Sequence, residues 1–231
     1  LASDLEQART NFFSAVSHEL KTPLQSIIGS AELLENGLVK PEDQPRFLNR
    51  IHQEADRLVA LINDILRLSQ LDEGGALPHE QVSVLELAQE AARSLTAQAA
   101  AQAVHISVTG TAGTVFGVRR LLYEIARNLC ENAVKYNVPG GSVTVEVAET
   151  DRDVTLLVRD TGIGIPEGDQ SRVFERFYRV DKSHSRAIGG TGLGLSIVKH
   201  AVAYHHGTLR LESQPGKGTV ITVTLPKEPT E

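Results

Sequence analysis

The sequence has no methionine and no tryptophan, and only one cysteine. Without a methionine, Leu1 is not a natural start, so we expect the chain to be part of a longer protein. The single Cys130 excludes an internal disulfide. Because it lies in an apolar helical pattern, we interpret it as a small core residue of a protein from a reducing compartment.

Long apolar runs and an excess of positive charge are also missing. No stretch approaches the roughly 18 apolar residues of a membrane helix, and the N-terminus does not resemble a signal peptide. A net charge of −6 argues against a nucleic-acid-binding surface. With 41% hydrophobic residues among 231, the chain can bury one large core or two modest ones. We therefore expect one or two soluble domains with no nucleic-acid partner.

Two helical patterns of apolar residues occupy the first 73 residues. Spacings of three and four residues run through 13–34, break at NGLVKPEDQP and resume over 48–65. The second run alternates three and four like the heptads of packed helices. This predicts an antiparallel helical hairpin. Leu33, Leu61 and Leu66 widen its apolar faces, and we expect dimerisation into a four-helix bundle to cover them.

Gly74, Gly75 and Pro78 end this periodicity. We therefore place a linker at 74–80, between a first domain of residues 1–73 and a second of residues 81–231. In the second domain we expect helices at about 84–101 and 118–136, paired strands such as SVTVEVAET and DVTLLVRD, and a glycine-led helix before a closing hairpin. These elements predict an α/β sandwich with a mixed sheet and helices on one face, so the whole chain is an α+β multidomain protein.

The helix expected at 118–136 carries a polar face beside its apolar one. Asn128, Asn132 and Lys135 follow each other at helical spacing. Asparagine is an indifferent helix former, so two on one face are a cost that a solvated surface does not require. An amide oxygen is a suitable ligand for Mg²⁺ between protein and nucleotide phosphates. An ordinary polar face remains the alternative.

Two glycine motifs follow. VRDTGIGIP places Asp160 at a strand end, where a carboxylate can accept a hydrogen bond from the exocyclic amine of adenine. Gly162 and Gly164 would allow close approach of backbone to a base, although a tight turn explains them equally. GGTGLGLSIVKH puts glycines before a helix, whose free N–H groups can hold phosphate. It fits neither a P-loop nor a dinucleotide fingerprint. The long segment between the motifs is typical of a functional lid or a disordered loop.

The first helical pattern contains FFSAVSHELKTPL. His18 points away from the apolar stripe, so we expect it to be exposed. No second histidine completes a zinc motif nearby. Pro23 removes the hydrogen bond to the carbonyl of Glu19, and its ring crowds that turn. We therefore expect the helix to be distorted at the turn that carries His18 and Glu19. A solvated surface histidine is the alternative interpretation.

Together these segments resemble the transmitter core of two-component sensor histidine kinases, over nearly the whole chain. FFSAVSHELKTPL resembles the family's H box, NLCENAVKYN its N box, DTGIGIP its G1 box, FERFYRVD its F box and GGTGLGLSIVKH its G2 box, in the family's order. The F-box and G2-box sequences are similar to those of the membrane-bound class exemplified by PhoR and WalK.

The resemblance implies a homodimerising phosphotransfer hairpin and a catalytic domain of the Bergerat ATP-binding fold, in a cytoplasmic part of a membrane-anchored sensor. It implies that His18 accepts phosphate from ATP, that Glu19 orients the imidazole and takes its proton, and that Thr22 serves a phosphatase reaction on the partner response regulator. Asn132 and Asn128 would hold Mg²⁺. The remaining nucleotide-binding positions that it implies are Lys135, Tyr136, Asp160, Gly162, Gly164, Gly190, Thr191, Gly192, Leu193 and Gly194. Arg176 and Arg179 would contact phosphate or the other domain, and Phe174 and Phe177 would anchor the lid.

Two other functions compete with the histidine kinase. A gyrase-like or chaperone-like ATPase would use the same ATP fold, but it would carry glutamate at position 128 and leave the hairpin histidine unused. A dimeric scaffold that kept only the fold would bind ATP without phosphorylation of His18.

Overall fold

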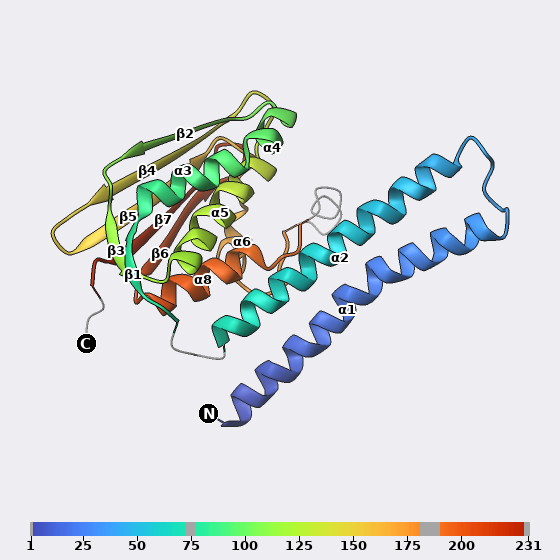
Figure 1. Ribbon diagram of the computed structural model, residues 1–231, viewed down its shortest axis with the longest axis horizontal. Helices are drawn as coiled ribbons and strands as arrows, with labels where there is room; N and C mark the ends of the chain where they lie inside the picture. The colour runs from blue at the N-terminus through green and yellow to red at the C-terminus, as the bar shows by residue number, and fades with distance from the viewer. Residues whose placement is uncertain (1, 73–76, 181–189, 229–231) are drawn as a thin grey trace.

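The first part of the protein is a long helical hairpin. The computed structural model describes residues 2–72, 77–180 and 190–228. Helices α1 (Ala2–Glu35) and α2 (Gln44–Asp72) pack side by side, and their joined end projects away from the second part (Figure 1). α1 continues through Pro23 without interruption. The predicted hairpin and the break between its helices are confirmed.

The hairpin leaves large apolar side chains uncovered in the single chain. They are 40 to 59% exposed, and comprise Phe13, Leu24, Ile28, Leu33, Leu48, Val59, Ile62 and Leu66. Leu61 is different, because it is buried in a cluster with Leu68 of α2 and with Leu193 and Ile197 of the second part. The prediction that a second copy covers Leu61 is therefore wrong.

No helix in the described part of the chain is long and apolar enough to cross a membrane.

The second part is an α/β sandwich. Its helices are α3 (Val84–Ser94), α4 (Thr96–Ala101), α5 (Arg119–Lys135), α6 (Glu167–Gln170) and α8 (Gly194–Tyr204). Its strands are β1 (Glu80–Ser83), β2 (His105–Gly110), β3 (Thr114–Gly117), β4 (Ser142–Glu149), β5 (Asp153–Asp160), β6 (Thr208–Gln214) and β7 (Gly218–Pro226). The main sheet has the order β2-β4-β5-β7-β6. β2 and β4 are parallel and the other neighbours antiparallel, which confirms the mixed sheet.

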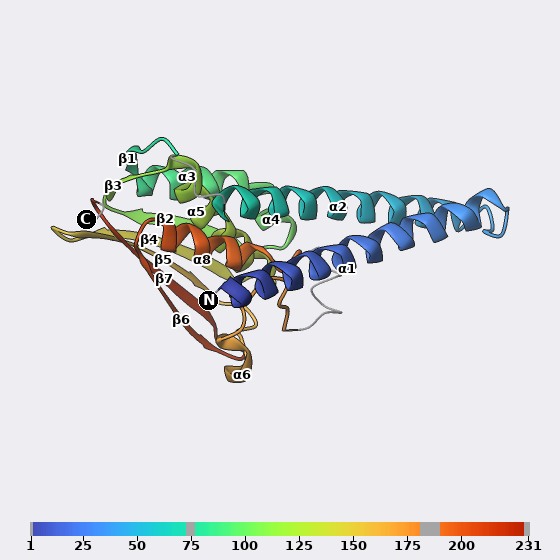
Figure 2. The same ribbon diagram turned by 90° about the horizontal axis from the view of Figure 1, so that it is seen from below.

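The helices α3, α5 and α8 lie on one face of this sheet (Figure 2). Alternate residues of β4 and β5 point into the core, as in Val143, Val145, Leu156 and Val158, and meet the apolar side of α5. This period-two burial follows directly from the alternating pattern in the sequence. The candidate site forms beside this core, against the polar side of α5.

Two details of this part differ from the predictions. The single helix expected at 84–101 is two helices that meet at Leu95. The hydroxyls of Ser94 and Thr96 donate to the carbonyls of Ala91 and Arg93 at 2.7 and 2.9 Å, and so compete with the regular helical bonds. The sequence analysis also missed the antiparallel pair β1 and β3, which is separate from the main sheet.

Cys130 lies fully buried on α5, as expected. Burial raises the pKa of its thiol to about 12. At pH 8 the thiolate fraction is then on the order of 10⁻⁴, against about a quarter at the ordinary pKa near 8.5. We expect a thiol reagent to label the native protein about 10³-fold more slowly than the guanidinium-unfolded protein. Equal rates in the two states would contradict this burial.

Candidate functional site

A cavity of about 460 Å³ lies against the polar side of α5. Its walls are α5, the end of β5 with the turn after it, the start of β7, the segment around Tyr178 and Arg179, the start of α8, and one side of α2. This volume lies within the range of small-molecule sites. Ten of the twelve predicted nucleotide-binding residues therefore line one space, and Gly162 and Leu193 do not.

The wall formed by α5 contains Asn128, Asn132, Lys135 and Tyr136, all of which line the cavity. The Nδ2 group of Asn128 donates to the backbone oxygen of Glu124 at 2.8 Å and to its Oε2 at 3.2 Å. The Lys135 ammonium lies 2.8 Å from Oε1 of Glu131, one turn earlier on α5. The polar face is a cavity wall and not an ordinary solvated surface.

Asp160 lies at the end of β5 and lines the cavity at a second wall. Its Oδ1 accepts from the backbone N–H groups of Gly162 at 2.8 Å and Thr219 at 3.2 Å. Both bonds go to one oxygen, so among the described residues Oδ2 is left available. Burial raises the pKa of this carboxyl, and the two N–H bonds oppose that rise.

The two glycines after Asp160 differ in place. Gly164 lines the cavity, has φ +70°, and passes so close to the backbone of Gln214 that a side chain would not fit. Gly162 is buried and lies outside the cavity lining, although its N–H fixes Asp160. Its part in the site is therefore indirect.

The glycine-rich segment forms another wall, which meets α5 where Gly194 lies beside Asn128. Gly190, Thr191, Gly192 and Gly194 line the cavity, and the N-terminus of α8 begins there. Leu193 is fully buried and instead contributes to the contact with α2. Residues 181–189 of the predicted lid lie outside the described residues.

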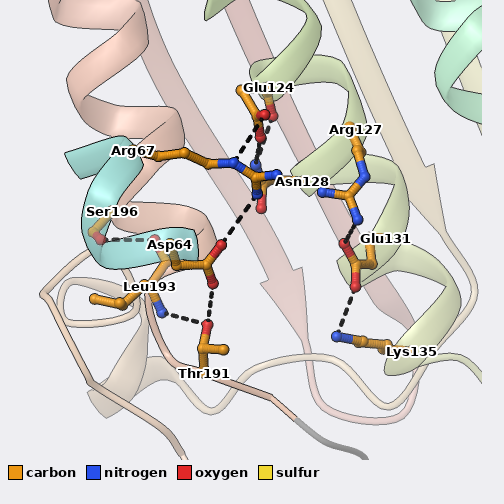
Figure 3. A network of polar contacts seen from close by, with 10 residues as sticks. All are labelled: Asp64, Arg67, Glu124, Arg127, Asn128, Glu131, Lys135, Thr191, Leu193 and Ser196. Carbon is orange, nitrogen blue, oxygen red and sulfur yellow. Dashed lines mark hydrogen bonds and ion pairs between the residues drawn. The ribbon is translucent and has the colours of Figure 1, made fainter. Parts of the chain in front are cut away.

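A wall that the sequence analysis missed is supplied by α2. Asp64 and Arg67 line the cavity and reach α5 and the glycine-rich segment (Figure 3). Burial raises the pKa of the Asp64 carboxyl, while the hydrogen bond from Thr191 and the charge of Arg67 act in the opposite direction. The charges of Asp64 and Arg67 did not indicate a cavity wall in the sequence, because charged residues are ordinary on a helical hairpin. Glu124 was missed too, although its position one turn before Asn128 could have indicated it.

The phosphoacceptor candidate lies outside the cavity. His18 is exposed on α1, as predicted, and is not among the lining residues. The hydroxyl of Thr22 donates to the backbone carbonyl of His18 at 3.3 Å. The Nη2 of Arg179 donates to Glu19 Oε2 at 3.0 Å, and the Arg179 side chain is only 5% exposed. In this arrangement the carboxylate beside His18 is held by the second part of the chain.

Two aromatic rings add a second contact to the same end of α1. Phe177 stacks on Phe12 with ring centroids 5.9 Å apart, and the Arg176 guanidinium lies 4.6 Å from the centre of the Phe12 ring. Phe177 has φ +64°, an uncommon conformation for a bulky residue, and its N–H donates to Gly192 at 2.9 Å. Arg176 and Arg179 were each considered for contact with phosphate or with the other domain. Both residues contact α1, and Arg179 also lines the cavity. Phe174 is partly buried, and the lid it would anchor includes residues outside the description.

The site offers complementary groups at its two ends. One end presents an accepting carboxylate, and the other presents amide oxygens and a helix N-terminus, which suit a purine and a chain of phosphates. Together, this site and an α/β sandwich joined to a helical hairpin fit the class of nucleotide-binding proteins.

Comparison with known proteins gives the family. Residues 8–74 match the His Kinase A (phospho-acceptor) domain, and residues 117–229 match the family described as Histidine kinase-, DNA gyrase B-, and HSP90-like ATPase. The sensor-like histidine kinase SenX3 of Mycolicibacterium smegmatis is 41% identical over 229 residues, covering 97% of this chain. The mycobacterial sensor histidine kinase MprB is 33% identical with a TM-score of 0.57, covering 66% of this chain and all of that structure. The chain belongs to the sensor histidine kinase family.

Two further facts bear on the extent of this likeness. The chain spans 59% of the length of SenX3. A histidine kinase ThkA chain, solved in complex with the response regulator protein TrrA, has a TM-score of 0.77 at 21% identity, with coverage of 98% of this chain and 64% of that one. This likeness to ThkA shows the same fold over both parts of the chain.

Proposed function

We propose that this chain is a protein-histidine kinase that phosphorylates His18 with ATP and passes the phosphoryl group to an aspartate of a response regulator. Residues 1–73 would form the dimerisation and phosphotransfer domain, 74–80 the linker and 81–231 the catalytic domain. The observation that carries the proposal is one cavity that gathers Asp160 and the two asparagines beside a hairpin with an exposed histidine. The end of α2 at Asp72 and the start of β1 at Glu80 support the domain division.

The cavity residues fit ATP with Mg²⁺. The Oδ2 of Asp160, which accepts no hydrogen bond from the described residues, would accept one from the exocyclic amine of adenine, which guanine does not present there. Asn128 has its amide nitrogen turned to Glu124, so its oxygen is available to a hard cation, and Asn132 supplies a second amide one turn on. Mg²⁺ would neutralise charge on the phosphates. Lys135 and the N-terminus of α8 would face the same charge.

The transfer itself requires His18 and Glu19. A ring nitrogen of His18 would form a bond to the γ-phosphorus while the bond from that phosphorus to the oxygen of ADP breaks. The ring proton would pass to the Glu19 carboxylate as general base. Because His18 lies outside the cavity and Arg179 holds Glu19, the catalytic domain must move for the reaction, or must serve the histidine of a second subunit.

The proposed partners follow from the hairpin. Its uncovered apolar side chains support a homodimer through a four-helix bundle. The complex of ThkA with a response regulator supports a partner of that class. Thr22 lies one turn from His18 on α1, where its hydroxyl could place water for a phosphatase reaction on that regulator. We further propose that the chain is the cytoplasmic part of a membrane-anchored sensor.

A labelling experiment tests the activity. The chain is incubated with Mg²⁺ and γ-labelled ATP, and we expect acid-labile, base-stable label on the protein. The label should vanish in His18→Gln and persist in His52→Gln, a matched change at an exposed histidine of α2.

Each other outcome has a definite meaning. Label that survives His18→Gln would overturn the assignment of His18. Phosphate release without labelled protein would indicate an ATPase, and nucleotide binding with neither product would indicate a scaffold.

A further inference from the structure

A network of polar contacts joins α2 both to α5 and to the glycine-rich segment (Figure 3). The Nε of Arg67 lies 3.3 Å from Glu124 Oε1 on α5. Its Nη1 donates to Asp64 Oδ1 at 3.2 Å, and Asp64 Oδ2 accepts from the Thr191 hydroxyl at 2.7 Å. Two residues of the hairpin therefore touch α5 and the glycine-rich segment together.

Glu124 fixes which way the amide of Asn128 points. The Nδ2 group of Asn128 donates to both the carboxylate and the backbone oxygen of Glu124. Its Oδ1 consequently faces the start of α8, where a Cβ added to Gly194 would lie 2.9 Å from it. Gly194 lines the cavity, so the accepting oxygen is turned toward the phosphate end.

The charge partner of Glu124 comes from the hairpin. The Glu124 side chain is only 8% exposed, and within the described ranges its ion pair is with Arg67. A buried carboxylate is costly unless it is paired, so removal of α2 takes away the group that compensates it. One of the two hydrogen bonds that orient the Asn128 amide, the one to the Glu124 carboxylate, is thus linked to contact between the two parts.

We propose that Arg67 is a positioning residue of the nucleotide site, which acts through Glu124 to hold the oxygen of Asn128 toward the metal. The inference rests on the proposed binding of ATP with Mg²⁺. It means that the catalytic domain binds metal-nucleotide more tightly when it is docked on α2. Because coupling is reciprocal, the metal-nucleotide also strengthens docking, and a movement of α2 changes the affinity of the site.

The test measures the Mg²⁺ dependence of nucleotide binding by the whole chain, with a fluorescent non-hydrolysable ATP analogue. Arg67→Gln is expected to raise the half-saturating Mg²⁺ concentration by about tenfold, the usual effect of removing a residue that orients a metal ligand. Affinity for the analogue in EDTA should stay within about twofold of wild type. Arg67→Lys, which keeps the charge, should recover most of the Mg²⁺ dependence and also serves if Arg67→Gln fails to fold.

Arg119→Gln is the matched control, because it removes the exposed ion pair with Glu90, at 2.7 Å, away from the cavity. An unchanged Mg²⁺ dependence in Arg67→Gln, or an equal loss with and without metal, overturns the inference. If the wild-type chain itself binds no nucleotide with Mg²⁺, the proposed function fails instead.

Discussion

Asp160→Asn is expected to weaken ATP binding by about 100-fold. The backbone N–H groups of Gly162 and Thr219 both donate to Oδ1, so an asparagine would keep its oxygen there. Its NH₂ group would then face the amine of adenine, donor against donor. An unsatisfied buried donor costs about 1–3 kcal/mol beyond the lost bond, which corresponds to roughly that factor. The measurement is an equilibrium titration with a non-hydrolysable ATP analogue.

The same substitution should not destabilise the fold. Burial raises the pKa of Asp160, which means that the folded state disfavours the charged carboxylate. An amide removes this unfavourable charge, so we expect the melting temperature to hold or rise. Asp151→Asn, in the exposed turn between β4 and β5, is the matched control and should bind like wild type. Unchanged affinity in Asp160→Asn would contradict the adenine role.

The periodic patterns of the sequence predicted most of the fold. Spacings of three and four gave the hairpin and α5, and alternation gave the core-facing residues of β4 and β5, because each pattern reflects burial on one face of one element. The same reasoning predicted that Asn128, Asn132 and Lys135 share a face, which lines the cavity.

The contacts between the two parts could not be predicted in this way. A leucine stripe shows that a face is covered but not by what, and Leu61 is covered by Leu193 and Ile197 instead of a second hairpin. The contact between Arg67 and Glu124 joins residues far apart in the sequence, each on a helix with other charges. Only the packed arrangement identifies such a pair.

Glu19→Gln is expected to lower the initial rate of autophosphorylation by about 10²-fold, at the low end of the usual contribution of a general base. Glutamine has nearly the same shape and retains an oxygen that can accept from Arg179, so docking at this end of α1 should persist. What it lacks is the basic carboxylate that would receive the proton of His18. Binding of the ATP analogue should therefore stay unchanged, which separates a loss of chemistry from a loss of affinity.

Arg179 links Glu19 to the nucleotide cavity. Arg179 donates to Glu19 and also to the backbone carbonyl of Thr191, and it lines the nucleotide cavity. Glu19 is thus tied to the phosphate end of the site while His18 stays outside it. Glu32→Gln, an exposed change further along α1, is the control and should leave the rate unaltered. A Glu19→Gln protein that labels at the wild-type rate would show that another group, or water, takes the proton.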